Sequence, residues 1–349
     1  MKLDPVRLAA LDVLLEVQGG RLLDPVLGLA QNQLPESRDR AFLAEMVRGT
    51  VQWRERYRHV LSKFVTRRLP DDPALIQILF LSLHQMLAMG SVPPYAAIHQ
   101  AGELCRARVS TRKVGFVNGV LQAVRRQLMP ETDEKDQTPS PEILEVRLQE
   151  LFADLASDPV KWLAAWTSHP QWLVKRWYDR FGRDGARSIC EANNHPVSLG
   201  FRVLEPQSPS EAARLLAEAG CPVLGGSGSR RLVATVRPGR DLLDSLLERF
   251  DWLIVQDPVV QRATSWLHAA RGEALEKGSW PGDRHPVLDM CAAPGGKTVR
   301  LAAAWPQAVP LLAMEPFAER MERLEDTLAR TGFSRLPLIR GDGIRPPLL

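Results

Sequence analysis

The sequence predicts a multidomain protein with an all-α bundle, a small α+β module and an open α/β domain whose first three strands are present. Apolar residues recur at helical spacing over residues 4–128. From Ser198 the pattern changes to short apolar strands that alternate with helices. Residues 287–349 read as strand, helix, strand, helix and strand, which favours a parallel sheet with helices on its faces. The predicted boundaries are 1–129 for the bundle, 130–141 for a linker, 142–251 for a helical plus α+β module, and 252–349 for the α/β domain.

Helix signals define the elements of the bundle and of the segment that follows it. Gly19 and Gly20 end the first helix, and Asp72–Pro73 begins another, because proline is tolerated in the first turn of a helix. The polar, acidic stretch PETDEKDQTPSP at residues 130–141 is typical of a linker. The later helices are expected at 72–89, 96–108, 114–128, 142–156, 159–166, 170–181 and 183–193.

Strand signals define the rest of the chain. In the α+β module we expect strands at 199–204, 231–236 and 252–256 and helices at 208–219 and 241–250. In the α/β domain we expect strands at 287–289, 309–314 and 336–339 and helices at 297–304 and 317–331.

Composition narrows the class of protein. The chain has 349 residues, of which 45% are hydrophobic and 25% are charged, as in ordinary globular proteins. It has no apolar run of the ~18 residues that a membrane helix needs, and no signal peptide at its start. The cysteines Cys105, Cys190, Cys221 and Cys291 are too scattered for a metal site or a disulfide framework. We therefore expect a cytoplasmic protein without a metal or a membrane partner, and a monomer.

The positive charge is concentrated in the first part of the chain. Residues 1–128 hold 18 Lys and Arg against 11 Asp and Glu, which gives +7 there, whereas the whole chain carries only +4. Most of the excess is arginine, which binds phosphate through two parallel hydrogen bonds and stacks on bases. This asymmetry favours RNA as a partner. The candidate RNA-binding residues are Arg48, Arg54, Arg56, Arg67, Arg68, Lys175 and Arg176.

One short motif carries the chemistry. The sequence Asp289-Met-Cys-Ala-Ala-Pro-Gly-Gly-Lys-Thr298 follows a strand and opens a helix, and its small residues leave the backbone N–H groups open to a ligand. A P-loop needs glycine where Cys291 stands, so a nucleotide-hydrolysing enzyme is excluded. The dinucleotide-binding pattern of three spaced glycines is also absent.

This motif resembles the cofactor loop of the rRNA (cytosine-C5) methyltransferases, which use S-adenosylmethionine (SAM) and have a Rossmann-like catalytic domain. The resemblance implies that Cys291, Ala292, Ala293, Pro294, Gly295, Gly296 and Lys297 hold the methionine and ribose portions of SAM. It also implies that Glu315 binds the ribose and Asp342 the adenine side. The family usually has aspartate at the position of Glu315, so this chain reaches slightly farther there.

A second resemblance covers residues 4–128. The segments Asp39–Phe42, Ala97–Leu104 and Gly115–Leu121 are similar to the RNA-binding antitermination factor NusB. Such a domain begins one bacterial subfamily of these enzymes, the RsmB/Sun/Fmu type, to which His169–Trp177 and Glu191–Asn194 are also similar. The resemblance implies methylation of C5 of a specific cytosine in 16S rRNA, with unassembled small-subunit RNA as the partner.

The resemblance also implies residues that these 349 do not contain. In the family a Thr-Cys thiolate adds to C6 of the cytosine so that C5 can take the methyl group, and a second cysteine after Asp-Ala-Pro assists release. Neither motif occurs here, and Cys291 lies in the cofactor turn, so we expect the nucleophile to lie beyond Leu349. We thus interpret the chain as a C-terminally incomplete copy with an open sheet edge, able to bind SAM weakly at best and inactive alone. The alternative is a non-catalytic NusB-like RNA-binding protein with a vestigial SAM domain.

Overall fold

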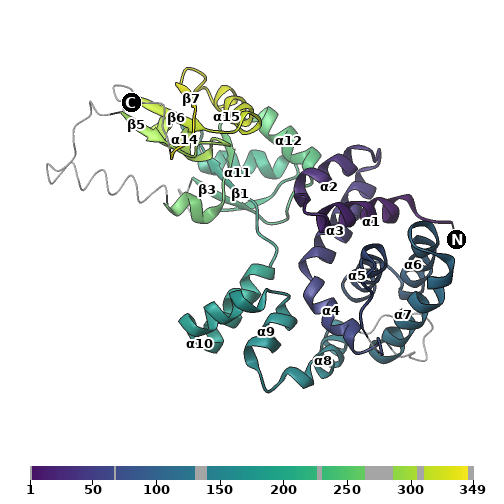
Figure 1. Cartoon of the computed structure of the whole chain (residues 1–349). Coiled ribbons are helices and arrows are strands. Elements are labelled where there is room, and N and C mark those ends of the chain that lie inside the picture. The colour runs from purple at the N-terminus through teal and green to yellow at the C-terminus, as the bar shows by residue number, and fades with distance from the viewer. Residues whose placement is uncertain are drawn as a thin grey trace. The chain divides into compact units, whose positions relative to one another are not determined.

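The computed structural model describes residues 2–66, 68–129, 140–225, 230–263, 286–304 and 310–344, and Figure 1 shows its helices and strands. The chain divides into two compact units, Met1–Pro196 and Val197–Leu349. The helices of residues 142–194 thus belong to the first unit, although the sequence analysis grouped them with the α+β module. The boundaries of the domains themselves stay a prediction. Most of the expected linker, residues 130–139, lies outside the described residues.

The first unit begins with the predicted helical bundle. Its helices are α1 (Pro5–Gln18), α2 (Leu23–Asn32), α3 (Ser37–Gln52), α4 (Arg54–Ser62), α5 (Pro73–Ala88), α6 (Pro94–Arg108), the short 3-10 helix η1 (Thr111–Lys113) and α7 (Val114–Leu128). Helix α2 was not predicted from the sequence. That helix has no side-chain cap at Leu22 and contains Gly28, so the usual start signal is missing and its propensity is low.

Helix α5 is the centre of the bundle and packs against α1, α3, α4, α6 and α7 (Figure 1). The side chain of Asp72 accepts hydrogen bonds from the first backbone N–H groups of α5, which fixes its start. Its polar side chains are buried but have partners: Gln85 accepts from Arg7 at 2.7 Å and Gln77 donates to Gln18 at 2.9 Å. These polar residues within the largely apolar helix α5 therefore belong to the core of the bundle. No helix in the described part of the chain is long and apolar enough to cross a membrane.

A second group of helices follows within the same unit. These are α8 (Pro141–Leu151), the 3-10 helix η2 (Ala153–Leu155), α9 (Pro159–Thr167) and α10 (Gln171–Asn194). The predicted break between helices at residue 182 is present as a kink, where Gly182 has φ of 71°. Helix α9 packs against α4 of the bundle, so the two groups share a common surface.

The second unit begins with an antiparallel sheet of order β2-β3-β1-β4. Its elements are β1 (Gly200–Val203), α11 (Pro209–Glu218), β2 (Val223–Leu224), β3 (Arg231–Ala234), α12 (Arg240–Arg249) and β4 (Leu253–Val255). One face of β1, with Phe201 and Val203, packs with residues of α11 and α12. Strand β2 was not predicted from the sequence, since a strand of two residues gives no alternating pattern.

The cofactor motif belongs to a parallel sheet of order β5-β6-β7. Its elements are β5 (Val287–Asp289), α14 (Gly296–Ala304), β6 (Leu311–Glu315), α15 (Ala318–Arg330) and β7 (Leu338–Arg340). Helix α15 buries Met321, Leu324 and Leu328 on one face, as its spacing predicted. The alternation of strands and helices therefore gives the predicted parallel arrangement among the described residues.

Candidate functional site

The turn between β5 and α14 is fixed by the carboxylate of Asp289. Its Oδ2 atom accepts a hydrogen bond from Thr298 Oγ1 at 2.7 Å, and its Oδ1 atom accepts one from the backbone N–H of Cys291 at 3.3 Å. Thr298 is completely buried. One side chain thus joins the last residue of the strand to the first turn of the helix.

The middle of the turn approaches helix α15 closely. Gly295 has φ of 105°, and a Cβ atom there would lie 3.0 Å from Thr327 Cγ2. Its carbonyl accepts from the N–H of Val299 at 2.8 Å as α14 begins. The glycine is therefore required both by its backbone conformation and by the space available.

The predicted SAM-binding residues of this turn differ in their exposure. Ala292, Ala293 and Gly295 are buried, Gly296 is half-buried, and Cys291, Pro294 and Lys297 are exposed. The other cysteines, Cys105, Cys190 and Cys221, are buried free thiols, and burial raises the pKa of each. A raised pKa keeps these thiols protonated, which makes them poor nucleophiles.

Glu315 is the last residue of β6 and only 1% exposed. Its Oε1 atom lies 3.6 Å from Arg320 and 3.4 Å from the N–H of Phe317, so both contacts are long. Arg320 also donates to the carbonyl of Ala293 at 3.4 Å. Arg320, which the sequence analysis did not single out, therefore connects the predicted ribose-binding acid to the cofactor turn.

Asp342 follows β7 and is exposed, and its Oδ1 atom accepts from the N–H of Ile344 at 3.0 Å. Its neighbour Gly343 lies against the turn after β5, since a Cβ atom there would be 2.7 Å from Met290 Cε. Because β5, β6 and β7 are parallel, their carboxyl ends share one edge of the sheet. The structure thus brings the turn, Glu315 and Asp342 to one edge.

The candidate RNA-binding residues lie in different surroundings. Ion pairs hold Arg48 to Asp24, Arg54 to Glu55, Arg68 to Asp71 and Lys175 to Asp179, all on the surface. Arg176 is exposed, and Arg67 lies outside the described residues. Surface ion pairs of this kind are weak and leave the cations available to phosphate.

Arg56 has a different role from its neighbours. Its guanidinium lies 3.8 Å from the ring centre of Trp166 and 5.2 Å from that of Trp53. Burial lowers the pKa of Arg56, although the nearby Glu145 raises it. The structure therefore places this arginine in a stacked contact between α4 and α9 rather than on an open face.

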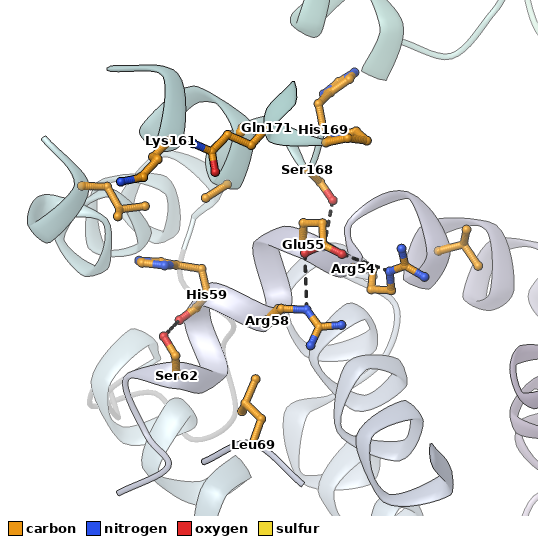
Figure 2. A pocket seen from close by; sticks show the side chains of 15 residues that line it. Arg54, Glu55, Arg58, His59, Ser62, Leu69, Lys161, Ser168, His169 and Gln171 are labelled. Carbon is orange, nitrogen blue, oxygen red and sulfur yellow. Dashed lines mark hydrogen bonds and ion pairs between the residues drawn. The ribbon is translucent and has the colours of Figure 1, made fainter. Parts of the chain in front are cut away.

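A cleft of about 730 Å³ lies in the first unit between α4 and the start of α10 (Figure 2). The cationic side chains of the cleft are Arg54, Arg58 and Lys161. Glu55 forms an ion pair with each of the two arginines. The N–H of Glu55 donates to Ser168 Oγ at 3.0 Å and so joins the two walls. Arg54 was predicted from the sequence as an RNA-binding residue, but the cleft was not, because Lys161 is 107 positions away along the chain.

Two histidines line the same cleft. Burial lowers the pKa of both His59 and His169, so both are neutral at pH 7. The positive charge of the cleft therefore comes from its arginine and lysine side chains. In the residues that the structure describes, no group of His, Cys, Asp and Glu is arranged to hold a metal ion.

Three separate segments of the chain match models of known protein families. Residues 4–126 match the NusB family. Residues 169–228 match the ferredoxin-like domain of RsmF/B-like methyltransferases. Residues 280–348 match the 16S rRNA methyltransferase RsmB/F family.

Curated relatives match over most of the chain. The probable ribosomal RNA small subunit methyltransferase B of Bacillus subtilis is 29% identical over 340 residues, which are 96% of this chain and 68% of the relative. The ribosomal RNA small subunit methyltransferase B of Cronobacter sakazakii is 28% identical over 318 residues, 90% of this chain and 64% of the relative. This chain therefore spans about two thirds of the length of these relatives.

A solved structure supports the fold. The protein titled PH0851 superposes with a TM-score of 0.61 at 19% identity, over 98% of this chain and 70% of its own. At this identity the likeness concerns the fold alone.

Proposed function

We propose that this chain belongs to an enzyme that uses SAM to methylate C5 of one cytosine in 16S rRNA. The chain carries a NusB domain and RsmB/F methyltransferase domains. The names of the relatives support rRNA as the substrate. The turn at 289–298 is similar to the cofactor loop of the cytosine-C5 enzymes. This similarity supports cytosine as the target base and C5 as the methylated atom. Unassembled small-subunit RNA is the proposed form of the substrate.

The buried carboxylate of Glu315 is the main support for SAM as the cofactor. A buried carboxylate needs hydrogen-bond donors, and Glu315 has only long contacts to Arg320 and Phe317 among the described residues. The two ribose hydroxyl groups of a nucleoside are donors of the kind that such an acid accepts. Its place at the carboxyl end of β6, where ligands of parallel sheets bind, supports the same assignment.

The remaining residues would surround the other parts of SAM. We assign the methionine and ribose portions to residues 291–297 and the adenine side to Asp342. The bound sulfonium group supplies an electrophilic methyl. The turn would orient that group, and the buried Ala292 and Ala293 carry only methyl side chains.

The attack on cytosine C6 needs a thiolate that the 349 residues do not provide. Cys105, Cys190 and Cys221 are buried and lie outside the SAM motif. The exposed Cys291 lies within the proposed cofactor-binding turn, so we assign it to SAM. We therefore expect the 349-residue chain to transfer no methyl group to unmodified 16S rRNA.

The substrate is tested by mapping 5-methylcytosine in the 16S rRNA of a strain that lacks the intact gene. One cytosine should lose its methyl group and regain it when the intact gene is returned. If every 5-methylcytosine of the 16S rRNA persists, the proposed reaction is wrong. Turnover by the purified 349-residue chain would contradict only the expectation that it is inactive alone.

The cleft of the first unit supports a second candidate function. Its arginine and lysine side chains favour RNA binding that needs no cofactor. A non-catalytic NusB-like RNA-binding protein would bind 16S rRNA with equal affinity in the presence and absence of SAM. It would also leave the 5-methylcytosine map unchanged when its gene is lost.

A further inference from the structure

Among the described residues of the second unit, two arginines lack the hydrogen-bond partners that buried arginines normally have. Arg202 on β1 is only 6% exposed, and its guanidinium makes no hydrogen bond or ion pair within the described residues. The Nε atom of Arg300 on α14 is buried without a hydrogen-bond partner in the described part of the chain. Arg300 as a whole is half-buried. A guanidinium group that is withdrawn from water without an acceptor is costly, so each of them requires an explanation.

The sheet register explains how these arginines meet. Arg202 lies opposite Arg231 of β3 and opposite Ile254 of β4. Cross-strand partners share a face of the sheet, so Arg202 lies on the face of Ile254. Ile254 packs in one cluster with Val299 of α14, the residue before Arg300. The antiparallel sheet and the helix of the cofactor turn therefore bring Arg202 and Arg300 together.

The surroundings of the pair are positive. Arg230, Arg231 and Arg300 all repel the charge of Arg202, while Glu205, whose side chain is 79% exposed, attracts it. Burial, followed by this repulsion, lowers the pKa of Arg202 to about 10. Burial and the charge of Arg230 also lower the pKa of Arg300. The fold thus holds like charges together at a cost in stability.

A structural arginine of the same unit shows the contrast. Arg330 is also partly buried, but its guanidinium donates to the carbonyls of Leu253 at 2.8 Å and Phe250 at 3.2 Å. Arg330 therefore joins α15 to the end of α12 and to the first residue of β4. Within the part of the chain that the structure describes, Arg202 and Arg300 make no equivalent bonds, so packing alone does not account for them.

We propose that Arg202, Arg230 and Arg300 form a binding site for a phosphodiester group of the RNA substrate. Arg230 is half-buried and is held by the carbonyl of Gln207 at 3.0 Å, which positions it beside the other two. A phosphate would supply the acceptor oxygens that Arg202 and Arg300 lack. RNA as the source of this phosphate rests on the proposed function.

The location of the site agrees with a role in placing the target nucleotide. Helix α14 begins at Gly296 in the cofactor turn, and Arg300 is one helical turn farther on. At ~1.5 Å per residue the two positions are about 6 Å apart along the helix axis. A phosphate on Arg300 would thus fix RNA close to the proposed methyl donor.

The test compares Arg300→Gln and Arg202→Met with the unaltered 349-residue chain. The probe is a fluorescein-labelled 16S rRNA fragment, and its Kd is measured over a range of salt concentrations. Arg214→Gln is the matched control, since Arg214 is an exposed arginine of the same unit that pairs with Glu211 and Glu218. Thermal unfolding of every variant, with and without inorganic phosphate, is the second measurement.

We expect Arg300→Gln and Arg202→Met each to weaken RNA binding about tenfold near 0.1 M salt. Each should also reduce the slope of log affinity against log salt concentration by ~0.7–1. The melting temperature of each should stay equal or rise, because a repelled charge is removed, and phosphate should stabilise only the unaltered chain and the control.

Three results would overturn the proposal in different ways. Unaltered RNA affinity in both variants, with RNA binding by the parent chain intact, refutes the site and leaves the proposed function standing. No RNA binding by the parent chain refutes the RNA assignment of the site together with the proposed function. A phosphate effect without an RNA effect would identify a free-anion site instead and would also overturn the proposal.

Discussion

Thr298 on α14 donates its hydroxyl hydrogen to the carboxylate of Asp289 at the end of β5, with 2.7 Å between Oγ1 and Oδ2. The same carboxylate accepts from the N–H of Cys291, so it holds the proposed SAM-binding turn from both sides. Thr298 is fully buried and Asp289 is half-buried, so the bond is largely shielded from solvent.

Replacing Thr298 by valine should therefore destabilise the turn. The loss of a buried donor to a carboxylate costs about 1–3 kcal/mol. We expect that decrease in the free energy of urea unfolding, and weaker SAM binding by titration calorimetry. Thr298→Ser keeps the hydroxyl and should retain most of both. An unchanged free energy of unfolding in the valine variant would show that the bond from Thr298 to Asp289 does not stabilise the turn.

Gly295→Ala should destabilise the protein more than Gly296→Ala. The first change puts a Cβ atom at φ of 105° and 3.0 Å from Thr327 Cγ2. We expect a loss of about 1–3 kcal/mol in unfolding free energy, since the left-handed conformation alone costs ~1–2 kcal/mol. A Cβ atom at Gly296 meets nothing closer than 3.7 Å, so that variant is the control. Equal unfolding midpoints for the two variants would contradict the geometry of the turn.

Glu315→Gln should weaken SAM binding without unfolding the domain. The carboxylate has only long contacts within the described structure, so the fold depends on it little. Hydrogen bonds to a charged group contribute about 1.5–3 kcal/mol, which corresponds to a loss of roughly 10- to 100-fold in affinity. Glu315→Asp keeps the charge and should lose less. If Glu315→Gln binds SAM as the parent chain does, the ribose is held elsewhere.

Arg56 and Arg54 should respond differently to alanine substitution. Arg56 stacks on Trp166 at 3.8 Å, and a desolvated contact of this kind contributes about 2 kcal/mol. Arg56→Ala should therefore lower the melting temperature. Arg54→Ala removes an exposed cation of the cleft and should weaken RNA binding while it leaves the melting temperature unchanged. The reverse pattern would make Arg56 an RNA contact, as the sequence predicted for both.

The stability of the protein should fall as the pH drops below 6.5. Burial lowers the pKa of His84 from 6.5 to about 4 in the folded protein. The unfolded chain thus binds more protons between these values, and the contribution is complete above pH 6.5 and lost toward pH 4. The effect is at most about 3 kcal/mol.

This pH dependence can be assigned by substitution. The slope of unfolding free energy between pH 4 and 6.5 should decrease in His84→Gln relative to the parent chain. Tyr57→Phe removes only the hydroxyl that lies 2.9 Å from His84 Nδ1 and should keep the slope. An unchanged slope in His84→Gln would show that other groups cause the acid sensitivity.

Local signals were sufficient for much of the fold. Asp72 and Pro73 start α5, Gly182 interrupts α10, and the spacing of Met321, Leu324 and Leu328 gives the buried face of α15. Each of these depends on neighbours within a few residues, which a sequence shows directly. Helix α2 and strand β2 were missed because they carry no such signal.

The sequence by itself predicted the proposed SAM-binding turn and the carboxylates Glu315 and Asp342 at the ends of the next two strands, since strand ends of a parallel sheet share one edge. Only the tertiary structure decided which charges meet. It put Lys161 opposite Arg54, stacked Arg56 between two tryptophans, and brought Arg202 of the antiparallel sheet to Arg300 of α14. The physical reason is that charge clusters depend on packing between segments about 100 residues apart, and no local periodicity encodes that packing.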